Sequence, residues 1–256
     1  MKRTEAEGLN KRYYLLDSIR GICILGMIVY HTLFDIVAFF GVPVTENLMT
    51  AVDVIRDFGA SCFICLAGIC IHFGKRPVKR LIMISVAALV VSIATFITVP
   101  DMPVIFGILT FMAAASLIIM PLKRYLDRLP GGICAIVSFI LFFITFEVRN
   151  HYLGWYFVQL LPIPDSFYRN YLTTALGFPF WGFATSDYYP LLPWIFMFFF
   201  GFFLWKCMKK SEKLMHILEF RLPFLEKIGK VSLYIYVLHQ PVILGILLLV
   251  FNIFLK

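Results

Sequence analysis

The chain has 256 residues, of which 61% are hydrophobic and only 15% are charged, and its formal net charge is +8. Its mean hydropathy of +0.88 lies far above that of soluble globular proteins. This composition excludes a soluble domain. It predicts an all-α integral membrane protein, because helices satisfy their own backbone polar groups inside a bilayer. No linker or low-complexity run divides the sequence, so we expect one domain over residues 1–256.

Seven apolar runs are long enough to cross the hydrocarbon core as helices, which takes about 17 to 25 residues. They occupy residues 14–40, 57–74, 79–99, 104–122, 131–148, 189–206 and 231–254. No cleavable signal peptide precedes the first run, so we expect that helix to remain as an anchor. The sequence thus predicts a single bundle of about seven transmembrane helices in the cell membrane.

The distribution of Lys and Arg predicts the orientation of this bundle. With a cytoplasmic N-terminus, nineteen of the 23 Lys and Arg residues fall in cytoplasmic segments. Cytoplasmic loops of membrane proteins carry such an excess. The positive charge therefore indicates orientation in a lipid bilayer, and we expect no nucleic acid as a partner.

Two segments outside the spans are long. The outer segment 149–188 is rich in aromatic residues, which favours either an interfacial helix with a Trp/Tyr belt or a lid or acceptor-binding surface. The cytoplasmic stretch 206–230 is typical of a basic amphipathic helix on the inner leaflet. The six cysteines lie in or beside apolar runs, so we expect neither disulfides nor a metal site.

The first predicted helix carries a stripe of ionisable residues. Arg20 and His31 are eleven residues apart, which in a helix is about 1,100° of rotation and about 16 Å of rise, so they share a face. Asp17 and Asp35 fall in the same wedge of that helix. Such a stripe is too costly to face lipid, and it predicts a bundle interior or a wet cavity.

Depth separates the expected roles of these residues. Arg20 lies near the cytoplasmic surface, where a guanidinium is suited to bind phosphate, unless it only forms an ion pair with Asp17. His31 lies toward the outer side and suits a general base, with Asp35 within reach to hold its tautomer. The alternative for His31 is a structural hydrogen bond to a neighbouring helix.

Three further polar residues are candidates for contact with a substrate. His239 and Gln240 lie near mid-membrane in the last predicted helix, where they either line the same cavity or join helices by hydrogen bonds. Asp187 precedes the sixth predicted helix and is either a substrate contact or a plain N-cap of that helix.

The chain resembles the bacterial branch of the heparan-alpha-glucosaminide N-acetyltransferase family. Five blocks in order carry the resemblance: RYYLLDSIRGICILGMIVYHTLFDI, FGASCFICLAGICIHFG, VIFGILTFMAAASLI, SDYYPLLPWIFMFFFG and IGKVSLYIYVLHQPVI. Arg20 and His31 also match an Arg, ten residues, His pattern of broader membrane acyltransferases, including acyltransferase family 3. Lysosomal members of the family have Asn at the His31 position and a His in the following outer loop. That loop contains no His here, so His31 takes the catalytic assignment.

This resemblance implies transfer of an acetyl group from cytosolic acetyl-CoA to a sugar or glycan on the other side of the membrane. His31 would act as general base or would carry the acyl group itself. Arg20 would bind the CoA phosphates together with a cytoplasmic cluster of Lys75, Arg76, Lys79 and Arg80, a cluster that positive-inside anchoring also explains. The alternative function is a transporter or flippase for a small anionic or sugar-linked solute, although no internal repeat supports it.

Overall fold

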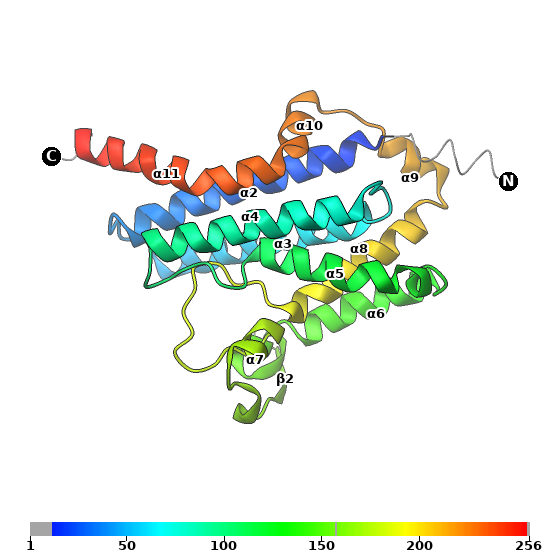
Figure 1. Ribbon diagram of the computed structural model, residues 1–256, viewed down its shortest axis with the longest axis horizontal. Helices are drawn as coiled ribbons and strands as arrows, with labels where there is room; N and C mark the ends of the chain where they lie inside the picture. Colours follow the sequence, from blue (N-terminus) through cyan, green and yellow to red (C-terminus); the bar gives the residue numbers. More distant parts are fainter. Residues whose placement is uncertain (1–11, 157, 255–256) are drawn as a thin grey trace. The chain divides into compact units, whose positions relative to one another are not determined.

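A computed structural model of the chain describes residues 12–156 and 158–254. The orientation prediction also counted basic residues among residues 1–11 and Lys256, which lie outside the described residues. Helices dominate the described chain (Figure 1), and within it six helical segments are long and apolar enough to cross a membrane. The prediction of an all-α integral membrane protein is therefore confirmed.

Six of the seven predicted spans correspond to these segments. The helices are α2 (Tyr14–Ala38), α4 (Pro77–Thr98), α5 (Ile108–Leu126), α6 (Gly131–Ile144), α8 (Leu191–Met208) and α11 (Ser232–Phe254). Their ends lie within a few residues of the predicted ends. The start of α5 is later than expected, and the residues before it include Phe106, whose φ of 59° is not helical.

The seventh predicted span, 57–74, corresponds to a different kind of helix. In the structure α3 covers Glu46–Cys70 and so begins well before the predicted start. Its first half contains Asp53, Arg56 and Asp57, and it is absent from the six segments that qualify as spans in the described chain. By length and composition six helices of the described chain qualify as spans, and α3 is a further long helix at the position of the seventh predicted span. The sequence pattern missed its first half because those charges interrupt the apolar run.

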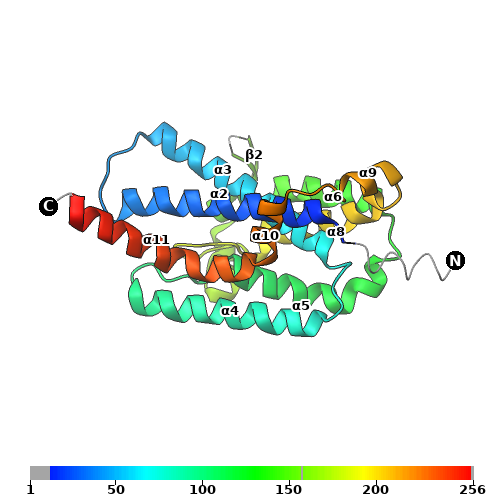
Figure 2. The ribbon, with the colours of Figure 1, turned by 90° about the horizontal axis from the view of Figure 1, so that it is seen from above.

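The described chain forms two compact units. The first unit comprises residues 12–63 and 211–254, and the second comprises Ile64–Lys210, so the division falls within α3. The single domain expected from the sequence stays a prediction. In the first unit, α2 packs against both α10 (Pro223–Lys230) and α11, and Figure 2 shows α11 running beside α2.

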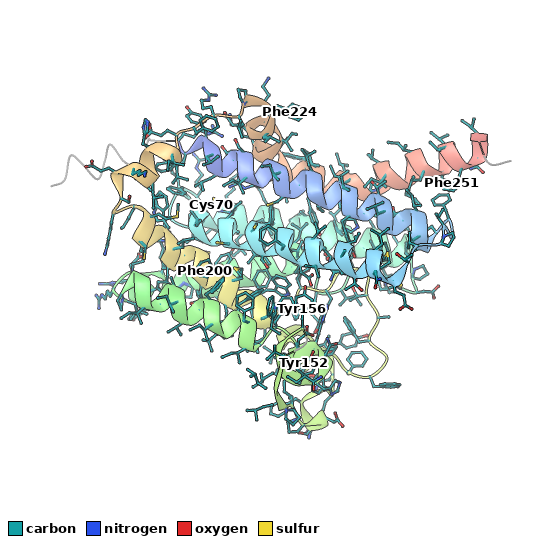
Figure 3. The ribbon with its side chains drawn as sticks, turned by 180° about the vertical axis from the view of Figure 1, so that it is seen from behind. Cys70, Tyr152, Tyr156, Phe200, Phe224 and Phe251 are labelled. Atoms are coloured by element: carbon teal, nitrogen blue, oxygen red, sulfur yellow. The ribbon has the colours of Figure 1, made fainter. Side chains whose placement is uncertain are left out.

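Two glycines bring α10 into backbone contact with the N-terminal half of α2. A Cβ atom added at Gly21 would overlap with the carbonyl of Leu225, and one at Gly229 would overlap with the carbonyl of Asp17. The expected amphipathic helix over 206–230 is instead two short helices, α9 (Glu212–Ile217) and α10. Pro223 begins α10, a position where its missing N–H leaves no hydrogen bond unmade. Phe224 of α10 is 71% exposed and is labelled in Figure 3.

The second unit is built around α8. This helix packs against α6 and α5, and α4 packs against α5. Gly68 in α3 and Gly201 in α8 allow close approach, because a Cβ at either one would overlap with a carbonyl of the other helix. The ammonium of Lys206 donates to three backbone carbonyls at the end of α5: Leu126 at 3.0 Å, Asp127 at 3.0 Å and Leu129 at 2.5 Å.

The outer segment 149–188 does not form the expected interfacial helix. It contains η1 (Val148–Asn150), an antiparallel pair of strands β1 (Tyr152–Trp155) and β2 (Val158–Pro162), η2 (Asp165–Phe167) and α7 (Tyr171–Leu176). Tyr152 and Tyr156 mark this hairpin in Figure 3. Gly154, with φ 147°, and Tyr156, with φ 47°, have backbone conformations that a helix excludes. The prediction of an interfacial helix is wrong, whereas a lid or acceptor-binding role stays a prediction.

Candidate functional site

The ionisable stripe predicted on the first helix lies on α2, which runs unbroken from Tyr14 to Ala38. Asp35, near its end, is fully buried. The amide of Gln240 in α11 donates to both carboxylate oxygens of Asp35, at 2.8 Å and 3.0 Å. A buried carboxylate needs such donors because its desolvation is costly. Two residues that the sequence assigned to different roles therefore form one pair.

The described residues show no hydrogen bond between His31 and Asp35, although the sequence led us to expect one. Asp35 is oriented by Gln240 instead, so the proposed tautomer control of His31 by Asp35 is corrected. The ring of His31 contacts the ring of His239, with centroids 4.8 Å apart. The predicted residues His31, Asp35, His239 and Gln240 thus come together between α2 and α11; we call these four the polar cluster.

His239 is itself held by the backbone of α11. Its Nδ1 lies 2.6 Å from the carbonyl oxygen of Tyr236. Among the described residues, two buried side-chain atoms have no hydrogen-bond partner, namely Nε2 of His239 and Oε1 of Gln240. Buried polar atoms are usually paired, so an unpaired atom indicates a site for a ligand or an ordered water.

A second charged group lies beside the polar cluster, and the sequence did not predict it. Arg56 of α3 donates to the hydroxyl of Tyr30 at 3.0 Å, to Asp53 at 2.8 Å and to Asp57 at 2.9 Å. The ring of Tyr30 contacts the ring of His31 edge-on, with centroids 5.2 Å apart. Arg56 was assigned no role from the sequence. The signal that could have found it is its position between two acidic residues in an otherwise apolar segment.

In the N-terminal part of α2, Arg20 donates to Asp17 at 2.8 Å and to the carbonyl oxygen of Gly229 at 3.4 Å. Arg12 also donates to Asp17, at 3.0 Å. The ion pair weighed as the simple alternative is therefore present. A guanidinium carries five donors, so this ion pair does not prevent Arg20 from also binding a phosphate. The predicted phosphate contact of Arg20 therefore stays a prediction.

The predicted basic cluster lies in the second unit. Lys75 and Arg76 precede α4, and Lys79 and Arg80 lie in its first turn. All of these except Arg80 are largely exposed. Arg20 belongs to the first unit, so a phosphate site shared between Arg20 and this cluster stays a prediction.

Asp187 lies at the start of a different helix from the one expected. One of its carboxylate oxygens accepts from the backbone N–H of Ile108, the first residue of α5, at 3.1 Å. Nearby, the hydroxyl of Thr185 donates to the carbonyl of Pro103 at 2.8 Å. An anion at a helix N-terminus satisfies unpaired N–H groups and complements the helix dipole. Asp187 therefore caps α5 from a distant loop, not the sixth predicted helix that follows it.

No group of three or more His, Cys, Asp or Glu residues in the described chain is arranged to hold a metal ion. All six cysteines are free thiols. The side chains of the polar cluster themselves can provide acid, base and hydrogen-bonding groups.

A family model matches residues 12–241, which is most of the chain, and describes the catalytic domain of heparan-alpha-glucosaminide N-acetyltransferase. Searches of curated proteins and of solved structures found no match. The matched range contains both α2 and the part of α11 that carries His239 and Gln240.

Proposed function

Because the chain belongs to the family of heparan-alpha-glucosaminide N-acetyltransferase catalytic domains, we propose that this multi-pass membrane protein transfers acetyl from cytosolic acetyl-CoA to a sugar or glycan on the extracytoplasmic side of the cell membrane. The family is one of membrane acetyltransferases. The donor, the acceptor and the roles of individual residues are our proposal.

The observation that carries this proposal is the meeting of His31 with His239 next to the Asp35–Gln240 pair. An imidazole in that position can serve acyl transfer in two ways. As general base it takes the proton of the acceptor while the acceptor attacks the thioester. As acyl carrier it attacks the thioester itself and passes the acetyl group on in a second step.

Arg20 supports a donor site at the cytoplasmic end of the same helix. The helical rise between Arg20 and His31 is about 16 Å, comparable to the length of an extended phosphopantetheine arm. We assign a phosphate of CoA to Arg20, and the basic cluster of Lys75, Arg76, Lys79 and Arg80 stays a separate prediction for phosphate binding. Of the three predicted acceptor contacts, His239 and Gln240 belong to the polar cluster, whereas Asp187 is engaged at the start of α5.

The test is acetyl transfer by the purified full chain in proteoliposomes, followed as release of CoA thiol from acetyl-CoA in the presence of glucosamine or methyl glucoside. The parent protein should release thiol in an acceptor-dependent way. The variant His31→Ala should bind CoA normally and lose transfer. Absence of transfer by the parent, together with uptake of the sugar into the liposomes, would favour the transporter function. Near-normal turnover by His31→Ala would refute the catalytic role of His31.

A further inference from the structure

The hydrogen bond of His239 determines which of its ring nitrogens carries the proton. Nδ1 lies 2.6 Å from the carbonyl oxygen of Tyr236. A carbonyl oxygen only accepts hydrogen bonds, so Nδ1 must be the N–H donor. In the neutral ring the lone pair is then on Nε2, because the partner of one nitrogen determines the state of the other. This same Nε2 is buried and has no partner among the described residues.

The orientation of Gln240 follows from the same reasoning. Its amide nitrogen donates to both oxygens of Asp35, which as a carboxylate only accepts. The amide oxygen of Gln240 is therefore the group left without a partner, and it is buried. Adjacent residues of α11 thus present two buried atoms that can only accept a hydrogen bond.

Two buried acceptors without donors need a bound molecule that supplies O–H or N–H groups, either an ordered water or a ligand, since an unpaired buried acceptor loses its hydration without compensation. The ring of His31 contacts the ring of His239 with centroids 4.8 Å apart. We propose that His239 is the catalytic base that accepts the proton of the acceptor's hydroxyl or amine, with the amide oxygen of Gln240 receiving a second hydrogen bond from that acceptor. This inference rests on the proposed acetyl transfer, and it leaves His31 the role of acyl carrier.

The resulting step balances as follows. The acceptor's proton moves to Nε2 of His239, and the acceptor's oxygen or nitrogen forms a bond to the acetyl carbon. The bond from that carbon to a ring nitrogen of His31 breaks, and this nitrogen regains its electron pair. In the preceding step His31 displaces the CoA thiolate from the acetyl group. The proton left on His239 passes to solvent, so that its Nε2 is free for the next turnover.

The first test measures the tautomer directly and does not depend on activity. Full-length protein labelled with nitrogen-15 histidine is placed in lipid bilayers, and the signals of His239 are assigned by their loss in His239→Gln. We expect the neutral ring to show a protonated Nδ1 and an unprotonated Nε2. A neutral ring protonated on Nε2 would overturn the proposal, because that nitrogen could not accept a proton.

The second test compares two acetyl acceptors. In His239→Gln, the new side chain can still hydrogen-bond the acceptor but cannot take its proton. We expect kcat for transfer to methyl glucoside to fall by about 10²- to 10⁴-fold, the usual contribution of a general base, with the KM for acetyl-CoA close to that of the parent. Transfer to hydroxylamine should persist, since this strong nucleophile attacks an acyl group while neutral and can lose its proton to water afterwards.

A matched control is His72→Gln in the second unit. The Nε2 of His72 bonds the carbonyl of Phe202 at 3.0 Å, and glutamine retains a donor there, so this variant should transfer to both acceptors like the parent. Loss of both reactions in His239→Gln would show that His239 only supports the structure. Retention of both would show that it is not the base. If the parent protein transfers acetyl to neither acceptor, the proposed function is refuted. The tautomer measurement still tests His239 in that case, because it does not depend on activity.

Discussion

The side-chain amide of Gln240 donates to both carboxylate oxygens of Asp35, at 2.8 Å and 3.0 Å, across 205 residues of sequence. This pair connects α11 to α2 beside the contact between His31 and His239. Each of the two side chains fixes the other, because a buried carboxylate requires donors and an amide nitrogen requires acceptors.

Breaking this pair should destabilise the protein. In Gln240→Leu the buried Asp35 carboxylate loses both hydrogen bonds from the amide nitrogen, so we expect the unfolding free energy to fall by about 1 to 3 kcal/mol. The double variant Asp35→Leu with Gln240→Leu should recover much of this loss, since no buried polar group is then left unpaired. Unfolding in detergent, measured for the parent, both single variants and the double variant, checks this. Equal stability of Gln240→Leu and the parent would contradict it.

Arg56 should matter more for stability than its partner Tyr30. Its guanidinium reaches Asp53, Asp57 and the hydroxyl of Tyr30 at the same time. The compact ammonium of lysine lacks that planar fork, so Arg56→Lys should leave the buried Asp57 poorly paired. We expect a larger drop in melting temperature for Arg56→Lys than for Tyr30→Phe, which removes one hydroxyl. A larger drop in melting temperature for Tyr30→Phe than for Arg56→Lys would contradict this central role of Arg56.

Arg20 should contribute to CoA binding through the shape of its guanidinium. If it binds a phosphate, Arg20→Lys weakens CoA binding by about 1.5 to 3 kcal/mol, the scale of a hydrogen bond to a charged group, although the charge is kept. Calorimetry with CoA and dephospho-CoA locates the contact: a loss restricted to CoA places Arg20 at the 3′-phosphate, and an equal loss places it at the diphosphate. Arg128→Lys is the control. Unchanged binding of both ligands would leave Arg20 only as the partner of Asp17.

Lys206 should stabilise the end of α5. Its ammonium donates to the carbonyls of Leu126, Asp127 and Leu129, and a cation at a helix C-terminus also complements the helix dipole. Lys206→Met keeps the length of the side chain and removes these donors, so we expect a loss of about 1 to 3 kcal/mol in unfolding free energy. Lys210→Met, at an exposed position, should change stability little. Equal effects of the two substitutions would contradict this capping role.

Glu226 should make the first unit sensitive to acid. The hydrogen bond from Lys230, aided by Arg221, lowers the pKa of Glu226 below its ordinary value of 4.5. A carboxyl group whose pKa is lowered on folding stabilises the fold above its ordinary pKa. That contribution is lost as the pH falls from 4.5 through the lowered value.

The corresponding variant is Glu226→Gln. It should be less stable than the parent at neutral pH, and the difference should shrink as the pH falls below 4.5. Thermal unfolding across this pH range measures it. Glu212→Gln, which alters an exposed carboxylate of α9, is the control for the loss of a surface charge. A stability difference that stays constant with pH would argue against the lowered pKa.

The apolar runs determine the membrane helices, because crossing hydrocarbon requires a stretch of apolar residues whose length can be read directly. The same local periodicity places Arg20 and His31 on one face of α2, since a helix repeats every 3.6 residues whatever it packs against. Where charges interrupt the run, as at Asp53, Arg56 and Asp57, this reasoning misplaces the helix start. The hairpin of the outer segment was also missed, because aromatic composition alone does not distinguish an interfacial helix from paired strands.

The sequence by itself therefore determined the class of protein, most of its spans and the polar residues that need partners. Only the tertiary structure decided which partner each residue has. Asp35 lies within helical reach of His31 but binds Gln240, and Asp187 caps α5 across 79 residues of sequence. The physical reason is that a helix's own periodicity depends on neighbouring residues alone. Pairing between helices depends on how their faces rotate and slide against each other, and that is set by packing such as the contacts at Gly21 and Gly229.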